Sequence, residues 1–385
     1  MGAGTMGSGI AQVAATNGHS VVVVDAQCDA LEHARVEIEK ALRREVEKGR
    51  LDEAMAAEIV SRIRFVDGAS AADGLNSFAT CALVIEAIVE RLDTKRDAFA
   101  RMARVVTDGC VLATNTSSLA VTAIASACKR PERVLGVHFF NPAPVMPLVE
   151  IIPWLGTSPE VATQTRALVD SWHKTTVLAT DTPGFIVNRV ARPFYGEALR
   201  IYDEGIADAA TIDWAMRELG GFRMGPFELM DLIGLDVNFA VTRSVFEAFF
   251  FDQRYKPSLT QQRLVEAGML GRKTGRGFYE YGEGAVKPQA SVDPALGAQI
   301  LERVLAMLIN EAVDAVHWRV ASAAEIDLAV TKGVNYPKGL LAWGAELGFE
   351  RVLAKLTELQ ELYGEDRYRP SVLLTRIVRD GTRLT

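Results

Sequence analysis

The chain has 385 residues, and its 42 basic and 49 acidic side chains give a formal net charge of −7. A hydrophobic fraction of 49% and a charged fraction of 24% are ordinary for globular proteins, which excludes a disordered or fibrous chain. The acidic balance gives no general attraction for nucleic acid or for an anionic membrane, so an anionic ligand needs a local basic cluster. The length predicts two or three domains.

Cysteine usage and hydropathy restrict the location. The spacing of the four cysteines fits neither a zinc site nor a small disulfide scaffold, which favours a reduced, cytoplasmic setting and no metal. No apolar stretch reaches the ~20 residues that a membrane helix needs, and the start of the chain is not a signal peptide. We therefore expect a cytoplasmic protein that binds neither membrane nor nucleic acid.

The first 180 residues alternate short apolar runs with helical patterns, which is typical of βαβ units around a mostly parallel sheet. Helices are expected at 29–48 and 92–105, and residues 29–62 predict a two-helix hairpin broken at Gly49. The predicted strands are 21–24, 63–66, 83–89, 111–114, 134–140, 148–152 and 176–179.

A glycine-rich loop opens the chain. Gly2, Gly4 and Gly7 form the pattern G-x-G-x-x-G, which allows a tight turn and a close approach of the backbone to a pyrophosphate at a helix N-terminus. The strand that follows ends in Asp25, whose carboxylate can bind ribose hydroxyls and repel a 2′-phosphate. The pattern predicts a Rossmann-type domain that binds NAD rather than NADP; the alternative for Asp25 is a solvated carboxylate at a strand end.

No strand precedes this loop, although the strand before it is central in a Rossmann sheet. Five buried aliphatic residues at ~1.5–3 kcal/mol each amount to roughly 10 kcal/mol. That sum is comparable to the ~5–15 kcal/mol stability of a typical domain. We therefore expect the native chain to begin several residues upstream, with this sequence an N-terminal truncation or a misassigned start.

After residues 181–184 (Asp-Thr-Pro-Gly) the pattern is helical throughout, with a looser linker at 281–294. An ungapped shift of 114 residues pairs Arg189-Val190 with Arg303-Val304 and brings Gly225 and Gly234 into register with Gly339 and Gly348, which indicates an internal repeat. We therefore expect three domains: an NAD-binding domain at 1–181, with the hairpin at about 29–62, and two all-α copies at 182–284 and 295–385.

Several motifs occur in an order that resembles the L-3-hydroxyacyl-CoA dehydrogenases. They are Asn-Thr-Ser-Ser at 115–118, Val-His-Phe-Phe-Asn-Pro at 137–142, Asp-Thr-Pro-Gly-Phe-Ile-Val-Asn-Arg at 181–189, Gly-Pro-Phe-Glu-Leu at 225–229 and Lys-Thr-Gly-Arg-Gly-Phe-Tyr at 273–279. Residues 363–371 are similar to the branch with a duplicated helical domain, which includes 3-hydroxybutyryl- and 3-hydroxyadipyl-CoA dehydrogenases. Many members of that branch carry an additional segment where this chain has a short linker.

The resemblance implies NAD-dependent oxidation of an L-3-hydroxyacyl-CoA to the 3-oxoacyl-CoA, as in the β-oxidation of fatty acids or in aromatic degradation. It places His138 as the general base, paired with Glu150, and assigns Ser117 and Asn188 to the oxygens of the acyl-CoA substrate. Taken singly, each has a structural alternative: a core histidine, a strand-end charge, and helix caps for the serine and the asparagine. All four at the family's positions favour the catalytic interpretation.

The resemblance also implies cofactor and CoA contacts. Thr5, Met6 and Asn115 join the glycine loop in the NAD site, and Glu90 and Lys95 lie near the nicotinamide half; the alternative for the last two is an exposed pair at a helix start. Lys48 is similar to a family position that contacts CoA, whereas most charges on such a helix form a solvated face.

The second helical copy has no equivalent site, since the 114-residue shift takes Asn188 to Glu302, and we expect it to be structural. In single-unit relatives the helical domain forms a homodimer, so the duplicate is expected to supply that contact within a monomer; a homodimer is the alternative. Two other functions stay open: a dehydrogenase of free hydroxy or sugar acids, and a non-catalytic NAD-binding protein.

Overall fold

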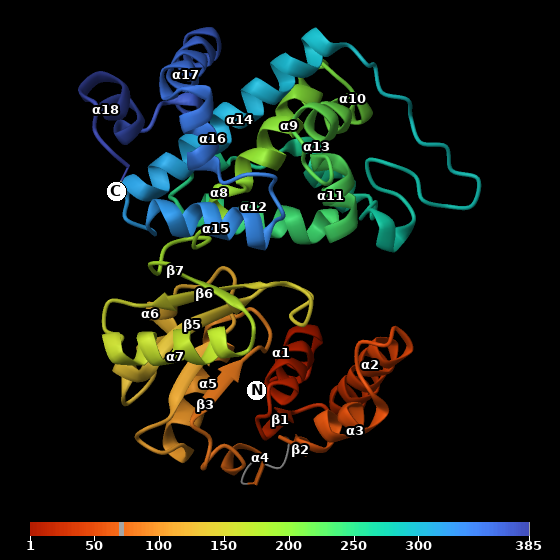
Figure 1. Cartoon of the computed structure of the whole chain (residues 1–385), viewed down its shortest axis with the longest axis vertical. Helices are drawn as coiled ribbons and strands as arrows, with labels where there is room; N and C mark the ends of the chain where they lie inside the picture. Colours follow the sequence, from red (N-terminus) through yellow and green to blue (C-terminus); the bar gives the residue numbers. More distant parts are fainter. Residues whose placement is uncertain (69–72, 385) are drawn as a thin grey trace. The chain divides into compact units, whose positions relative to one another are not determined.

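The structure is a computed structural model that describes residues 1–68 and 73–384. The chain forms two compact units, Met1–Thr182 and Pro183–Thr385. All named strands lie in the first unit, and the second is built from helices (Figure 1). Within the described ranges, no helix has the length and the apolar character that crossing a membrane requires.

The first unit is a sheet with helices on both faces. Its strands are β1 (Val21–Asp25), β2 (Ile63–Asp67), β3 (Leu83–Glu86), β4 (Val111–Thr114), β5 (Val134–Phe139), β6 (Leu148–Pro153) and β7 (Thr175–Leu178). Its helices are α1 (Thr5–Thr16), α2 (Cys28–Glu47), α3 (Glu53–Ser61), α4 (Asp73–Asn76), α5 (Leu92–Val105), α6 (Val121–Ala125) and α7 (Pro159–Ser171). The order β3-β4-β5-β6-β7, with only β5 and β6 antiparallel, confirms the predicted Rossmann-type α/β fold.

Strands β1 and β2 form a separate parallel pair, and the start of the chain lies between this pair and β3. The amino group of Met1 donates to the carbonyl of Ile85 at 2.7 Å, and Ala87 N donates to the carbonyl of Met1 at 2.8 Å. On the other side, Gly2 N donates to the carbonyl of Val24 at 2.8 Å. Met1 and Gly2 therefore lie between β1 and β3 and form hydrogen bonds to both sides.

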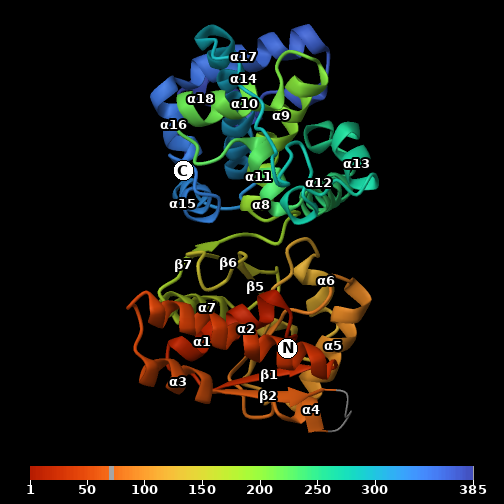
Figure 2. The same ribbon diagram turned by 90° about the vertical axis from the view of Figure 1, so that its right-hand side faces the viewer.

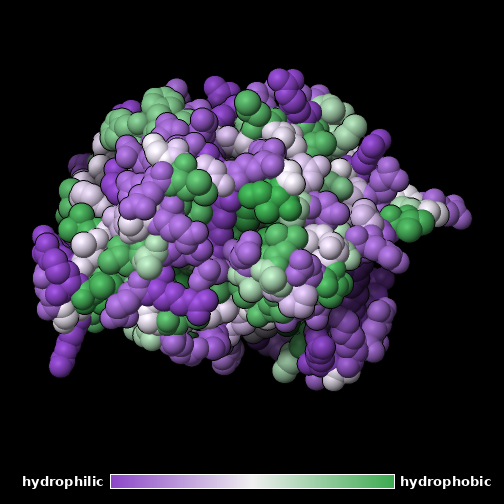
Figure 3. Space-filling view, turned by 90° about the horizontal axis from the view of Figure 1, so that it is seen from above, coloured by the Kyte–Doolittle hydropathy of each residue, from purple (hydrophilic) through white to green (hydrophobic). Residues whose placement is uncertain are grey.

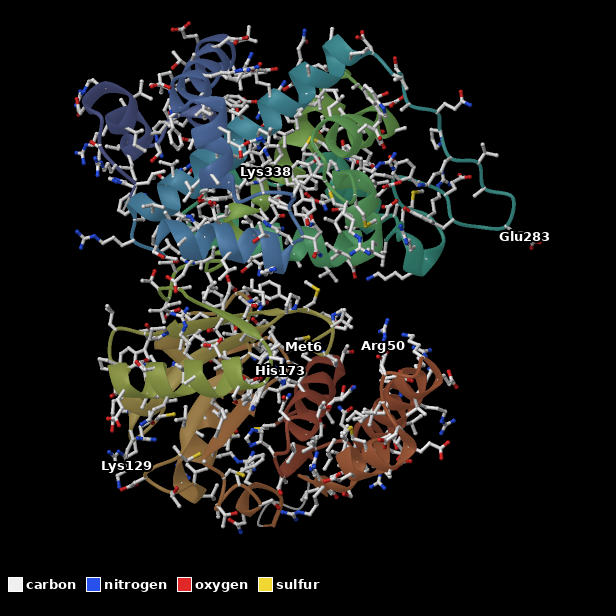
Figure 4. The ribbon with its side chains drawn as sticks, viewed as in Figure 1. Met6, Arg50, Lys129, His173, Glu283 and Lys338 are labelled. Atoms are coloured by element: carbon white, nitrogen blue, oxygen red, sulfur yellow. The ribbon has the colours of Figure 1, made fainter. Side chains whose placement is uncertain are left out.

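Helices cover both faces of this sheet (Figures 1 and 2). On one face α1 and α7 pack on β5 and β6 through residues such as Ile10 and Val169, and on the other α4, α5 and α6 form a core around Phe99. Helices α2 and α3 lie within the range predicted for the hairpin and are joined through Gly49 at φ +67°, and Figure 4 shows Arg50 between them.

The second unit repeats one helical arrangement. Its helices are α8 (Val187–Val190), α9 (Arg192–Asp203), α10 (Ala209–Trp214), α11 (Pro226–Ile233), α12 (Leu235–Ala248), α13 (Leu259–Glu266), α14 (Pro294–His317), α15 (Ala323–Gly333), α16 (Leu340–Leu347), α17 (Phe349–Tyr363) and α18 (Val372–Asp380). The loop before α14 carries Glu283 at its outer end (Figure 4). Seen from the side of this unit, the surface is mostly hydrophilic with separate apolar patches (Figure 3).

The correspondence between the copies extends to single hydrogen bonds. Asp213 accepts from the backbone N–H groups of Phe227 and Glu228, both at 2.9 Å. Asp327, 114 residues later, accepts from the N–H groups of the residues equivalent to those two, at 2.8 and 3.0 Å. Gly234 and Gly348 adopt φ of +103° and +84° at the equivalent helix junctions, a conformation that favours glycine.

Reciprocal buried ion pairs hold the copies together. Arg189 Nε lies 2.6 Å from Glu311 Oε1, and Arg303 Nε lies 2.6 Å from Glu197 Oε1. Because Arg303 and Glu311 are the equivalents of Arg189 and Glu197, each copy offers the same surface to the other, as in an isologous dimer. The boundaries of the two helical domains stay a prediction.

We expect Glu197→Gln to lower the free energy of unfolding by about 3–5 kcal/mol, because it leaves the buried Arg303 guanidinium without its nearest countercharge. Urea denaturation followed by circular dichroism measures the change. The matched control is Glu302→Gln, which removes a partly exposed pair with Arg351 and is expected to cost less than about 1 kcal/mol. Equal losses in the two variants would contradict a special contribution of the reciprocal pairs.

Candidate active site

The glycine loop leaves space for a ligand at one position only. A Cβ atom on Gly2, which has φ +97°, would lie 2.6 Å from the carbonyl oxygen of Ala87, and one on Gly7 would collide with the carbonyl of Gly2. A Cβ on Gly4 would meet no atom within 4 Å. Two glycines therefore permit the fold of the loop, and the third keeps open the surface at the N-terminus of α1.

The N-terminus of α1 presents backbone donors to that open surface. Gly4 is the N-cap and no side chain caps the helix; within residues 1–68 and 73–384, the N–H groups of Thr5, Met6 and Gly7 have no acceptor. Such donors, together with the helix dipole, suit a pyrophosphate. Asp25 lies beside the loop, where its Oδ2 accepts from Ala3 N at 2.7 Å. The loop therefore has the donors and the space that NAD requires.

A buried ion pair lies at the carboxyl end of β3. Lys95 Nζ is 2.6 Å from Glu86 Oε1, and the two side chains are 1% and 0% exposed. The other oxygen of Glu86 accepts from Thr114 Oγ1 at 2.7 Å, and Ile88 N donates to Oε1 at 2.7 Å. This carboxylate thus connects β3, α5 and β4. The alternative of an exposed pair at a helix start is wrong for Lys95.

Glu90 extends this network to the loop after β4. Its Oε1 accepts from Thr116 Oγ1 at 2.6 Å and from the N–H groups of Ser117 and Ser118 at 3.0 and 3.1 Å, while Oε2 lies 3.2 Å from Lys95 Nζ. Burial opposes the ionisation of Glu90, but the Lys95 ammonium and these donors outweigh it and lower the pKa of the carboxyl. A charged Glu90 therefore orders the loop that carries Ser117.

Sequence reasoning missed Glu86 and Thr114. The one available signal was an acid inside the apolar run 83–89, since a carboxylate in such a run needs a buried partner.

His138 and Glu150 lie directly opposite each other on the antiparallel strands β5 and β6. His138 Nδ1 is 2.6 Å from Glu150 Oε2, and the two side chains are 6% and 0% exposed. Glu150 is in the middle of β6, so its alternative as a strand-end charge is wrong. Asn115 lies next to this pair, with Oδ1 accepting from Phe139 N at 2.8 Å.

Ser117 follows the end of β4, whose Thr114 pairs with Gly136 two residues before His138. It is partly buried, and among the described residues its Oγ has no hydrogen-bond partner. The capping bond to Leu119 N comes instead from Thr116 Oγ1, at 3.0 Å. The helix-cap alternative for Ser117 is therefore wrong, and its hydroxyl is available to a ligand.

The remaining predicted residues lie elsewhere. Asn188 belongs to the second unit, inside α8, where it caps no helix, so that alternative is also wrong. Lys48 is the C-cap residue that follows α2, and it forms an exposed pair with Glu45 at 3.1 Å. In the part of the chain that the structure describes, no group of histidine, cysteine and acidic side chains could hold a metal.

Known families match both units. Residues 1–182 match the family described as "3-hydroxyacyl-CoA dehydrogenase, NAD binding domain". Residues 184–281 and 300–383 match "3-hydroxyacyl-CoA dehydrogenase, C-terminal domain". Together these matches cover nearly the whole chain.

Individual relatives agree with the family matches. A 3-hydroxyadipyl-CoA dehydrogenase of Escherichia coli is 41% identical, over 97% of this chain and 95% of its own length. The mitochondrial hydroxyacyl-coenzyme A dehydrogenase of Homo sapiens is 40% identical over 73% of this chain and 90% of its own. The crystal structure of a 3-hydroxybutyryl-CoA dehydrogenase of Escherichia coli is similar with a TM-score of 0.91 and 40% identity, covering 99% of this chain and 98% of that one.

We expect Glu86→Gln to lower the free energy of unfolding by about 3 kcal/mol, because it leaves the Lys95 ammonium buried with a single, partly exposed countercharge. We also expect weaker binding of NADH, measured by fluorescence titration, because the loops at this edge lose their common anchor. Asp97→Asn on the same helix is the control, since its side chain is 69% exposed, and should cost less than about 1 kcal/mol. A Glu86 variant as stable as this control would refute the anchoring role.

Proposed function

Because this chain belongs to the 3-hydroxyacyl-CoA dehydrogenase family, it catalyses the NAD-dependent oxidation of a 3-hydroxyacyl-CoA to the 3-oxoacyl-CoA, and we propose that His138 is the general base. The observation that carries the proposal is the 2.6 Å contact between His138 Nδ1 and the buried Glu150 carboxylate. An imidazole held by a carboxylate in this way is oriented for proton transfer.

The contact with Glu150 determines which ring atom of His138 reacts. Nδ1 donates its proton to the carboxylate, so Nε2 carries the lone pair and accepts the proton of the 3-hydroxyl. Glu150 then stabilises the imidazolium that forms, because it is an anion held in a buried position. NAD supplies the acceptor for the hydrogen that leaves carbon 3 with its electron pair.

Ser117 and Asn188 are assigned to the oxygens of the substrate. Both side chains can donate hydrogen bonds, and donors fixed in advance at a developing carbonyl oxygen lower the barrier. Support for Ser117 comes from its hydroxyl, which the fold leaves unused, and from the ordering of its loop by Glu90. Asn188 is partly exposed on α8 and so can reach a ligand.

The residues that we assign to NAD lie at the start of α1 and at the carboxyl ends of the neighbouring strands. We assign the pyrophosphate to Gly2, Gly4, Thr5, Met6 and Gly7 at the start of α1, and the adenosine ribose to Asp25. The nicotinamide half is assigned to Glu90, Lys95 and Asn115, whose side chains surround the carboxyl ends of β3 and β4.

Coenzyme A is assigned to the helical hairpin. Lys48 is exposed near its tip, where a phosphate can replace Glu45 as its partner. We place the protein in the cytoplasm, because its four cysteines are free thiols. We also infer a monomer in which the two helical copies pair with each other, with a homodimer as the alternative.

We expect His138→Gln to lower kcat by about 10²- to 10⁴-fold, since the variant has no base for the hydroxyl proton. NADH formation from 3-hydroxybutyryl-CoA measures the rate, and thermal unfolding verifies the fold. His33→Gln, on the exposed face of α2, is the control and should leave the rate unchanged. Full activity in a folded His138→Gln protein would exclude His138 as the base.

We expect the reaction to depend on the CoA group, because CoA binding supplies orientation that a free acid lacks. Comparing kcat/KM for 3-hydroxybutyryl-CoA and free 3-hydroxybutyrate tests this, and similar values would favour a dehydrogenase of free hydroxy acids. We expect Lys48→Ala to raise KM for the CoA substrate only.

A further inference from the structure

Arg192 is a buried cation without a countercharge. Arg192 is the first residue of α9 and is 7% exposed. Within the described ranges, no carboxylate lies within ion-pairing distance of its guanidinium. Burial accordingly lowers the pKa of its guanidinium. An unpaired buried charge is strongly unfavourable, so its presence needs a reason.

The other buried arginines of this unit behave differently. Arg189 pairs with Glu311 and Asp314, Arg303 pairs with Glu197, and Arg367 lies 3.6 Å from Glu197. The fold therefore supplies carboxylates to arginines that hold the two copies together. Arg192 is the exception among the buried arginines that the structure describes.

The groups around Arg192 leave hydrogen-bond donors unused. Its Nη1 donates to Thr242 Oγ1 at 3.2 Å, and its guanidinium lies over the ring of Tyr195 at 4.9 Å. Neither Arg192 Nε nor the nearby Tyr336 hydroxyl has a partner in the described structure. A carboxylate, with two oxygens that only accept, matches such a set of donors.

The internal repeat shows that the helical fold does not need an arginine here. The shift of 114 residues takes Arg192 to Ala306 and Asn188 to Glu302. In the second copy these two residues line an apolar cavity of about 280 Å³, together with Leu301 and Leu305. Arg351 and Lys355 also line this cavity, but both come from another helix, so the repeat itself places alanine at the position equivalent to Arg192.

The position of Arg192 relative to Asn188 links it to the substrate. The two residues are four apart in a nearly continuous helix, so their side chains share one face. One helical turn rises about 5.4 Å. Three successive single bonds span about 4 Å. A carboxylate three carbons beyond carbon 3 is therefore within reach of the long Arg192 side chain when Asn188 holds the 3-oxygen.

We propose that Arg192 binds a carboxylate at the far end of the acyl chain, which makes the enzyme selective for 3-hydroxyacyl-CoA substrates that are dicarboxylic. The inference rests on the proposed function, because it takes Asn188 as the contact of the 3-oxygen. Arg192 is a specificity residue that touches the substrate away from the reacting carbon, and Tyr336 contributes a second donor.

The test compares two six-carbon substrates, 3-hydroxyadipyl-CoA and 3-hydroxyhexanoyl-CoA, which differ in the terminal carboxylate. We expect the unmodified enzyme to favour the first by at least about tenfold in kcat/KM, since a hydrogen bond to a charged group contributes that much or more. We expect Arg192→Met to lower kcat/KM for the adipyl substrate by about 10- to 100-fold more than for the hexanoyl substrate, mainly through KM. Arg192→Lys should recover part of the preference.

Arg243→Met is the matched control, since this arginine is exposed on α12 and outside the site; it should change neither value. Equal kcat/KM for the two substrates in the unmodified enzyme, or equal losses in Arg192→Met, would overturn the proposal. The first comparison needs no variant, so it decides even where Arg192→Met fails to fold. If neither substrate is oxidised, the proposed function itself fails, which is a separate outcome.

Discussion

The single antiparallel pairing in an otherwise parallel sheet is the constraint on which the proposed catalytic site depends. The reversal between β5 and β6 sets His138 directly opposite Glu150, so the distance between imidazole and carboxylate follows from backbone register. Two neighbouring features depend on the same strands. Asn115 Oδ1 accepts from Phe139 N on β5. The loop that carries Ser117 begins after Thr114, the last residue of β4 that pairs with β5. A shift of one residue in this register would turn one of the two side chains to the other face.

The buried charged side chains differ in what neutralises them: some are paired within the fold, and others are assigned to a ligand. Arg189 with Glu311 is a satisfied pair that joins distant elements, and Lys95, which we assign to the nicotinamide half, is held in place by Glu86. Glu90 is partly exposed at the edge of the sheet to which we assign the nicotinamide. Arg192 has no acidic partner among the described residues, and it lies four residues after the asparagine assigned to the substrate.

Local patterns predicted much of the structure. The strands were foreseen because short apolar runs between helical segments have few other interpretations, and β4 has the expected bounds. The repeat was visible because glycines and charged residues recur at one spacing. What the sequence could not provide were contacts between distant residues, such as Arg303 with Glu197 or Glu86 with Thr114, because hydropathy does not indicate which buried charge finds which partner. The same limit left Arg192 unnoticed: only the surrounding packing shows that it lacks a carboxylate.

Placing two related helical copies on one chain changes how their contact behaves. Two separate chains associate to a degree that falls on dilution, whereas two segments of one chain meet at an effective concentration set by the linker. The pairing of Arg189 with Glu311 and of Arg303 with Glu197 is therefore independent of protein concentration. Covalent linkage also releases the pair from strict symmetry, because a mutation in one copy is not repeated in the other. That freedom is what allows Asn188 and Arg192 to stand where the second copy has Glu302 and Ala306.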